Sequence, residues 1–392
     1  MKSVPEIRFP GFTDLWELRK VGEFAVESCE KGHNGQEALK LTVKLHTKGV
    51  CKMEEKGQGS DNTQYYVRHA GQLIYGKQNF FNGAIGIVPQ SLDGYESTKD
   101  VPTFDIDDNV CVEWFYQYIA RPEIYKSQEV NCTGTGSKRF HVNAFFDMNI
   151  PIPLIEEQKK ISDYFKAIDN LITLQEQRCQ VLKRLKQCML QKMFPKDGFD
   201  KPEIRFPGFT DSWEQRKFGD VGSVSMCKRI FKNETSDGGD IPFYKIGTFG
   251  GEPDAYISRE LFEEYKKKFS YPNEGDILLS ASGTIGRIVE YTGEDAYFQD
   301  SNIVWLSHDK SICNKFLKVL YPTVKWDGIE GSTIKRLYND NFLKTQFMMP
   351  KIEEQERLGE YFEQLDHLIT LQERKCKVLR ELKKCMLQKM FV

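Results

Sequence analysis

Residues 155–194 read IEEQKKISDYFKAIDNLITLQEQRCQVLKRLKQCMLQKMF, and residues 352–391 read IEEQERLGEYFEQLDHLITLQERKCKVLRELKKCMLQKMF. Of these 40 aligned positions, 25 are identical, and the second copy begins 197 residues after the first. A shorter segment, PEIRFPGFTD, occurs at 5–14 and returns at the same distance, at 202–211. The stretches between these anchors differ almost completely. The chain is therefore a tandem duplication with one repeated frame and two different inserts.

Each 40-residue block has the pattern of a long amphipathic helix. Pro153 and Pro350 precede the two blocks, and two glutamates occupy each first turn, where negative charge is favourable. Apolar residues then recur every three or four positions, namely Ile161, Phe165, Ile168, Ile172, Cys179, Leu182 and Met189, and Leu358, Phe362, Leu365, Ile369, Cys376, Leu379 and Met386. Such helices would be about 60 Å long. We expect them to pack on each other as a coiled-coil spacer; the alternative is that each lies on its own domain.

The anchors divide the chain into five parts. We expect domains at 1–153 and 202–350, long helices at 154–194 and 351–392, and a linker rich in Pro, Gly and charge at 195–201. Within the inserts, alternating patterns predict short strands, such as 41–45, 275–280 and 302–306, and we expect a helix at 260–268. The prediction is an α+β chain in which two mixed α/β domains are joined by the helices, with a pseudo-twofold tandem repeat.

The composition excludes several classes of protein. Of the 392 residues, 40% are hydrophobic and 12% aromatic, which is typical of globular domains. No run approaches eighteen apolar residues, and the first residues contain no secretory core, so we expect a cytoplasmic protein that does not contact a membrane. The ten cysteines show no zinc-binding spacing. A net charge of −2 means that any DNA-binding face must come from local clusters of basic residues.

One short motif occurs in both inserts at the 197-residue distance. Gly134-Thr135-Gly136-Ser137-Lys138-Arg139 aligns with Gly331-Ser332-Thr333-Ile334-Lys335-Arg336. Glycine, short hydroxyls and two cations together suit a phosphate group. Because the motif is common to two different inserts, it would grip the DNA backbone rather than select bases. The alternative is a tight turn whose basic pair is only solvated.

Further candidates for DNA contact lie in strand-to-turn segments and basic clusters. The segment 71–77, which ends at Lys77, together with 80–86 that follows it, looks like the counterpart of 275–286, which ends in a glycine turn. Loops of this kind present side chains to a partner. The remaining candidates are Ser280, Ser282, Thr284, Arg287, Lys228 and Arg229.

Motifs for catalysis are missing from the sequence. It has no Walker loop, no nucleophile elbow and no Pro-Pro dipeptide of amino-methyltransferases. Asp254 with Glu264 and Lys266 is the nearest approach to a nuclease pattern, and such patterns often arise by chance in a highly charged chain. We therefore predict no catalytic residue and no metal site in this chain.

The chain resembles the specificity (S) subunits of bacterial type I restriction-modification systems. The resemblance rests on PEIRFPGF before each insert, on the strand and turn at 275–286, and on Pro-x-Ile-Glu-Glu-Gln before each long helix, and it covers essentially the whole chain. It implies that each insert is a target-recognition domain for one half of a bipartite site in double-stranded DNA. It further implies that the helices pack antiparallel and set the spacer between the half-sites.

The resemblance also implies partners. Two modification subunits, which carry S-adenosylmethionine and methylate adenine N6, would dock on the two helices; we name Phe165, Ile172, Leu182, Phe362, Ile369 and Leu379 for this role. Restriction subunits, which use ATP and Mg²⁺, would join that complex. This chain would be non-catalytic and bind no cofactor itself. The alternatives are a coiled-coil scaffold whose inserts bind proteins, or a stand-alone nuclease.

Overall fold

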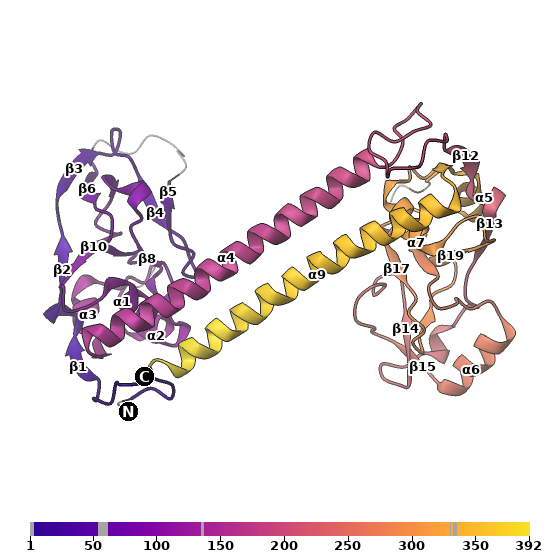
Figure 1. Ribbon diagram of the computed structural model, residues 1–392. Helices are drawn as coiled ribbons and strands as arrows, with labels where there is room; N and C mark the ends of the chain where they lie inside the picture. The colour runs from indigo at the N-terminus through magenta and orange to yellow at the C-terminus, as the bar shows by residue number, and fades with distance from the viewer. Residues whose placement is uncertain (1–3, 54–61, 135–136, 330, 332–334) are drawn as a thin grey trace. The chain divides into compact units, whose positions relative to one another are not determined.

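The computed structural model describes residues 4–53, 62–134, 137–329, 331 and 335–392, and these form two compact units (Figure 1). Unit 1 contains residues 1–175 and 375–392, and unit 2 contains residues 176–374. The two long helices are α4 (Ile155–Lys192) and α9 (Ile352–Lys389). Each helix contributes residues to both units, so each unit consists of one insert and parts of two helices.

Unit 1 is built around a four-stranded antiparallel sheet in the order β2-β10-β7-β8. These strands are β2 (Ala25–Ser28), β10 (Thr103–Ile106), β7 (Leu73–Tyr75) and β8 (Ile85–Ile87). A separate pair joins β1 (Glu17–Lys20) to β11 (Asn149–Ile152). Smaller sheets contain β3 (Lys31–Asn34), β6 (Gln64–Arg68) and β9 (Tyr95–Ser97), and β4 (Leu41–Val43) and β5 (Val50–Lys52). The helices of the insert are α1 (Val112–Ile119), α2 (Pro122–Ser127) and α3 (Val142–Phe146).

Unit 2 repeats this frame. Its four-stranded antiparallel sheet has the order β13-β19-β16-β17, formed by Gly222–Ser225, Ile303–His308, Ile277–Ser280 and Ile288–Glu290. The separate pair is β12 (Glu214–Lys217) with β20 (Gln346–Met349). A three-stranded sheet contains β15 (Tyr256–Ile257), β14 (Ile241–Tyr244) and β18 (Tyr297–Phe298), and β14 pairs with β18 in parallel. The helices are α5 (Phe218–Val221), α6 (Arg259–Lys268), α7 (Asn314–Leu320) and α8 (Asn339–Lys344). The inserts therefore differ in their outer sheets and agree in their central one.

The repeated sequence anchors explain the shared frame. Arg8 donates two hydrogen bonds to the carboxylate of Glu157, at 2.6 and 2.8 Å, and Glu157 is fully buried. In unit 2, Arg205 binds Glu354 in the same way, at 2.7 Å for both bonds. The short segment before each insert is thus fastened to the first turn of the long helix after that insert.

The glutamine of each Pro-x-Ile-Glu-Glu-Gln motif makes a second fastening. The Gln158 amide donates to the carbonyl of Pro153 at 2.9 Å and accepts from the backbone of Cys111 at 2.8 Å, just before α1. Gln355 makes the equivalent bonds to Pro350 and Cys313 before α7, at 2.9 and 3.0 Å. Because both glutamines are buried, these bonds replace those that the amides would make to water.

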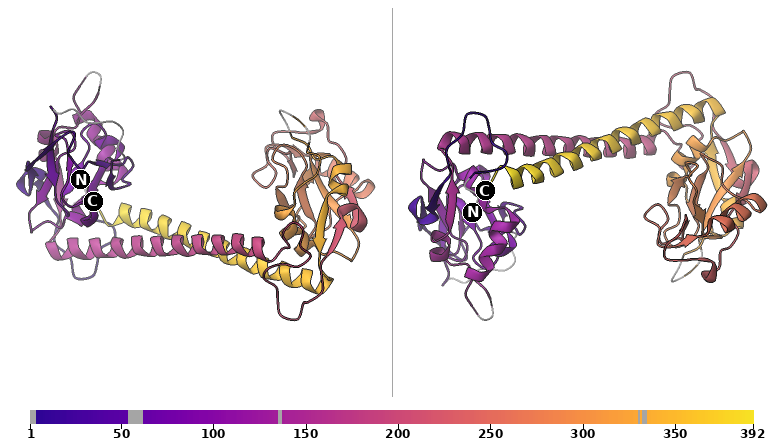
Figure 2. Two further views of the ribbon diagram at one scale, coloured as in Figure 1. Left: turned by 90° about the horizontal axis from the view of Figure 1, so that it is seen from above. Right: turned by 90° about the horizontal axis from the view of Figure 1, so that it is seen from below.

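Each unit is closed by the end of the helix from the other repeat. In unit 1 the ring of Phe391, at the end of α9, stacks on Phe165 of α4 at 5.9 Å and lies 6.1 Å from Trp114. The backbone of Ile7 donates to Lys389 of the same helix end at 2.9 Å, so the start of the described chain lies beside the end of α9 (Figure 2).

Unit 2 has the same closure, in which Phe194 at the end of α4 stacks on Phe316 of α7 at 5.9 Å. There Ile204 donates to Lys192 at 2.9 Å.

The two helices run antiparallel within each unit. In unit 1 Lys383 of α9 binds Asp169 of α4, and in unit 2 Lys186 of α4 binds Asp366 of α9, both at 2.6 Å. Asp366 and Lys383 lie 197 residues after Asp169 and Lys186, so the two ion pairs are equivalent in the repeat. They are partly exposed, so they contribute little stability, but they agree with one register of the helices. The predicted fold class, with two mixed α/β domains and two long antiparallel helices in a tandem repeat, is confirmed.

Candidate nucleic-acid interface

The strand-to-turn segments that the sequence suggested as counterparts are equivalent in the two units. Gly71 and Gly275 both have positive φ, 88° and 89°, and lead into β7 and β16. After these strands, Lys77 donates its backbone N–H to the carbonyl of Asp100 at 2.8 Å, and Ala281 donates to that of Asn302 at 2.7 Å. The same backbone groups therefore connect two loops in each unit.

The segment with the basic pair attaches to the same place. In unit 1 the backbone of Phe140 donates to Lys77 at 2.8 Å, and in unit 2 that of Leu337 donates to Ala281 at 2.8 Å. Each unit thus brings together three loops that are distant in sequence. In each unit the first loop follows β7 or β16, and the second precedes β10 or β19. The third loop contains the end of the shared motif.

In unit 1 the end of the shared motif pairs with the residue just before the motif, and both of its cations have acidic partners. Thr133 and Arg139 exchange backbone hydrogen bonds at 3.0 and 2.9 Å, and Gly134 has a φ of 118° that suits glycine. Lys138 binds Glu129 at 2.7 Å, and this partner raises the pKa of the lysine. Arg139 binds Asp100 at 3.3 Å. Ser137 is exposed, and the predicted contact Thr135 lies outside the described residues.

In unit 2 the motif pairs with the glycine turn after β16. Gly331 again has a positive φ, 107°, and Gly283 donates its N–H to Lys335 at 2.9 Å. Lys335 and Arg336 are exposed, and neither has an ion-pair partner among the residues that the structure describes. Ser332 and Thr333, also predicted contacts, lie outside those residues. Within the described part of the chain, the second motif therefore presents two cations without an acidic partner.

Two of the predicted serines are structural. Ser280 is 1% exposed; its hydroxyl donates to Thr284 at 2.6 Å and accepts from the Arg287 backbone at 2.9 Å. Ser282 is buried and donates to the side chain of Asn302 at 2.7 Å. They stabilise the turn and are not available to a partner. Thr284 and Arg287 remain exposed, although the Arg287 guanidinium also donates to a backbone carbonyl at 2.8 Å.

The two residues of the basic pair after β13, Lys228 and Arg229, have different surroundings. Arg229 binds Asp300 at 2.9 Å, which places it beside the loop that precedes β19. The Lys228 ammonium lies 5.2 Å from the ring of Phe269, a cation–π contact. An open hollow of about 440 Å³ lies next to the same loop and is lined by Met226, Ala281, Ser301, Arg336, Leu337, Tyr338, Asn339 and Asp340. The sequence indicated the cations but not this hollow, whose walls come from four separate segments.

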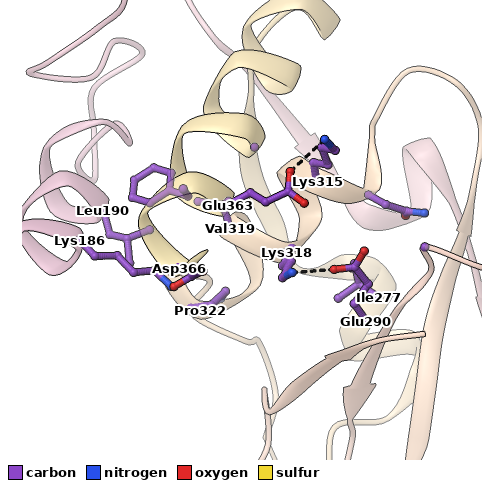
Figure 3. Close-up of a pocket in the computed structure, with 14 residues that line it drawn as sticks. Lys186, Leu190, Ile277, Glu290, Lys315, Lys318, Val319, Pro322, Glu363 and Asp366 are labelled. Atoms are coloured by element: carbon purple, nitrogen blue, oxygen red, sulfur yellow. Dashed lines mark hydrogen bonds and ion pairs between the residues drawn. The ribbon is translucent and has the colours of Figure 1, made fainter. Parts of the chain in front are cut away.

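A second cavity in unit 2, of about 280 Å³, lies between α7 and the long helices (Figure 3). Three lysines line it, and each has an acidic partner: Lys315 binds Glu363 at 2.9 Å, Lys318 binds Glu290 at 2.6 Å, and Lys186 binds Asp366. Because every cation is neutralised, the cavity offers no free charge to an anionic ligand. The ion pair between Lys315 and Glu363 instead connects the insert to α9.

Three of the six residues named for partner docking are buried, and the other three are half-buried. Phe165 and Phe362 are buried in the cores of their own units, so they cannot bind a partner as we expected. Ile369 is also buried, and Ile172, Leu182 and Leu379 are half-buried.

A different set of apolar side chains is exposed on both helices at equivalent positions. On α4 these residues are Leu171, Leu174, Val181 and Leu185, and on α9 they are Leu368, Leu371, Val378 and Leu382. We call these eight residues the apolar stripes. Their exposed fractions range from 38% to 62%. In the sequence, Leu171, Leu185, Leu368 and Leu382 only widen the apolar pattern of each helix, and the spacing of three, seven and four residues does not distinguish the stripes from the buried seam.

The acids of the weak nuclease pattern are each paired with a lysine. Asp254 binds Lys245 at 2.8 Å, and Glu264 binds Lys268 at 2.8 Å. Among the described residues, no cluster of three or more His, Cys, Asp or Glu side chains could hold a metal ion. Over the same residues, none of the helices combines the length and apolar character needed to span a membrane.

Two known proteins with similar sequences are type I restriction enzyme specificity subunits. A putative type I restriction enzyme specificity subunit of Haemophilus influenzae is 58% identical over 158 residues, which are 39% of this chain and 41% of that protein. The match thus spans less than half of that relative. The MjaVIII specificity subunit of Methanocaldococcus jannaschii is 24% identical over 335 residues, 81% of this chain and 74% of that protein.

Solved structures show the same fold. The type I restriction-modification S subunit from M. genitalium superposes with a TM-score of 0.58 at 13% identity, over 99% of both chains. A chain from a structure of a type I restriction-modification system gives 0.56 at 20% identity, again over 99% of both chains. The model of the type I restriction modification DNA specificity domain matches residues 100–184 and 210–381, one region in each repeat. The chain therefore belongs to the type I restriction-modification DNA specificity family.

Proposed function

We propose that this chain is the non-catalytic DNA-specificity subunit of a type I restriction-modification complex. Residues 1–153 and 202–350 would be target-recognition domains, and each would bind one half of a bipartite site in double-stranded DNA. The observation that carries the proposal is the meeting of three loops at equivalent backbone positions in both units, with different side chains on them. A constant frame with exchanged side chains suits a protein that reads two different sequences.

The shared motif would bind the phosphate backbone in each half-site. Phosphate contacts position a protein on DNA, and base contacts give specificity. Lys335 and Arg336 support this role in unit 2, because both are exposed and have no acidic partner among the residues that the structure describes. In unit 1, a phosphate would have to compete with Glu129 and Asp100 for the equivalent cations.

Replacing Lys335 and Arg336 together by alanine should weaken DNA binding by the assembled complex for all sequences. Each lost phosphate contact lowers the salt dependence of the binding constant by about one unit of slope, so the double variant should lose about two. Binding titrations at several salt concentrations measure this slope. A matched variant, Lys310→Ala, removes an exposed lysine elsewhere in unit 2 and should leave binding unchanged. A changed choice of bases in the double variant would contradict the phosphate assignment.

The long helices would set the spacer between the half-sites and bind two modification subunits. The apolar stripes support the second role, because exposed apolar residues at equivalent places on two antiparallel helices suit two copies of the same partner. Those partners would supply S-adenosylmethionine and adenine-N6 methylation. Restriction subunits would supply ATP-driven cleavage with Mg²⁺.

Charged substitutions in the apolar stripes test the docking role. Leu171→Glu with Leu368→Glu should abolish co-purification of the modification subunit without unfolding the chain, because both side chains are exposed, at 47% and 42%. The single variants should each reduce the bound partner from two copies to one, as measured by native mass spectrometry. Thr173→Glu with Thr370→Glu places the same charges on exposed positions of the helices outside the stripes and serves as the control. Retention of two partner copies in the leucine double variant would exclude this surface.

The function itself is tested by mapping methylated adenines in DNA from cells that express the chain with its modification subunit. One split motif, absent when the chain is deleted, is the expected result. Methylation that does not depend on the chain would overturn the proposal. A complex that forms but methylates a continuous motif would refute the two-half-site arrangement alone.

A further inference from the structure

The loop before β10 in unit 1 and the loop before β19 in unit 2 end at equivalent residues. Asp100 and Asn302 accept the same backbone hydrogen bond, from Lys77 and Ala281 respectively. Their side chains differ but do similar work: Asp100 binds Arg139 of the shared motif, and Asn302 binds Ser282, whose backbone pairs with Arg336 of the other copy. In both units, therefore, this loop is coupled to the proposed phosphate contact.

The residue just before this anchor is exposed in both units and differs between them. It is Lys99 in unit 1 and Ser301 in unit 2. The loop also differs in length. In unit 1 the N–H of Val101 closes the turn onto Thr98, three residues back, whereas in unit 2 the N–H of Ile303 closes onto Gln299, four residues back. One anchored position thus presents a different side chain, on a turn of different length, in each half of the chain.

In unit 2 the neighbours of Ser301 are all restrained. Gln299 accepts from the backbone of Ile246 at 2.9 Å, Asp300 binds Arg229, and Asn302 binds Ser282. Ser301 itself has a φ of 53°, a left-handed conformation that is uncommon for serine. The described part of the chain offers its hydroxyl no hydrogen-bond partner, and the residue lines the hollow that contains Arg336. Strained residues that the surrounding structure restrains are concentrated at functional sites.

In unit 1 the equivalent side chain is also displayed. The ammonium of Lys99 lies over the ring of Tyr66, at 5.7 Å, and the residue is exposed. A lysine is a donor only, and it suits the O6 and N7 acceptors of guanine in the major groove, whereas a serine hydroxyl can donate or accept.

From this juxtaposition we infer that Lys99 and Ser301 occupy one specificity position, whose side chain contacts a base edge and helps to select the sequence of its half-site. The inference rests on the proposed function and adds to it the residues that choose bases. The shared Lys-Arg motif beside this position then sets how closely the loop approaches the DNA. The single side chain before the anchor differs between the two units. Lys99 is assigned to a guanine, and Ser301 to a base whose edge accepts or donates one hydrogen bond.

The test uses the complete complex with its modification subunit and a DNA library in which both half-sites are randomised. Ser301→Gly removes the hydroxyl and suits the left-handed backbone, so the variant should fold. It should lower the preference for one base pair in one half-site by roughly tenfold, as expected for a lost base contact, and leave the other half-site unchanged. Lys99→Met should relax a guanine preference in the opposite half-site only.

Two control variants accompany these substitutions. Ser307→Ala alters an exposed serine at the far end of β19, and Lys126→Met removes an exposed lysine on α2; neither should change the base preference. Retained base preferences in Ser301→Gly and Lys99→Met would overturn the inference, as would a uniform loss at every sequence, which indicates a phosphate contact. If the unaltered complex methylates no split motif, the proposed function itself fails, and that outcome is seen before any variant is compared.

Discussion

Replacing Arg8 by alanine should destabilise unit 1 by about 3–5 kcal/mol, because it leaves a buried carboxylate without its counter-charge. Glu157 is fully buried, whereas the Arg8 side chain is 14% exposed. Arg205→Ala should have the same effect on unit 2, where Glu354 is 2% exposed. Urea unfolding measures the free energy, and hydrogen exchange shows which unit has lost protection.

Glu157 is fully buried and Arg8 is partly exposed, so removing one charge or the other should have different costs. This difference provides the control for the prediction. Glu157→Gln removes the buried charge and leaves a cation that can reach water, so its cost should be smaller than that of Arg8→Ala. The double variant Arg8→Met with Glu157→Met should recover most of the loss, since a well-packed apolar pair can replace a buried ion pair. A loss below about 1 kcal/mol in Arg8→Ala, typical of a surface ion pair, would show that the bidentate contact does not carry this anchor.

Replacing Phe391 by alanine should also cost about 3–5 kcal/mol, the usual range for removing a buried phenylalanine. The ring is 4% exposed, contacts Trp16, Trp114 and Phe165, and lies 5.0 Å from the guanidinium of Arg121. Its loss should release the end of α9 from unit 1, so that amides in 375–392 exchange faster with solvent. The fluorescence of Trp16 and Trp114, which contact the ring, should report the same transition.

Phe194→Ala is the matched change in unit 2, where the ring contacts Trp213 and Phe316. Because no arginine is stacked on it in the described residues, its loss should be the smaller of the two. Gln388→Ala, an exposed position one turn from Phe391, should leave stability within about 0.5 kcal/mol. Equal protection of 375–392 in Phe391→Ala and in the unaltered chain would mean that other contacts retain the helix end.

The duplicated frame could be predicted because repetition needs no knowledge of contacts. The helices appear at Ile155–Lys192 and Ile352–Lys389, close to the expected blocks, and the strands at 41–43, 277–280 and 303–308 and the helix at 259–268 lie where their patterns indicated. These elements could be predicted because a helix or strand with one buried face repeats its apolar residues with the period of that element.

One part of the docking prediction was wrong, because Phe165, Phe362 and Ile369 are buried. A spacing of three and four residues shows that a helix has an apolar side, but it does not say which apolar residues face the core. Phe165 and Phe362 are buried by aromatic residues of their own units, and the exposed residues of the apolar stripes lie next to them on the same helices. Assigning each side chain to a seam or a surface required the packing.

The repeat and its periodicity were enough to establish the duplication, the long helices and the family resemblance, because all three are patterns along one chain. Which loops meet was decided by the tertiary structure. The equivalence of Lys77 with Ala281, and of Asp100 with Asn302, does not follow the 197-residue distance, because the inserts differ in loop length. Hydrogen bonds between adjacent strands set this equivalence, and they join residues that are close in space and far apart in sequence.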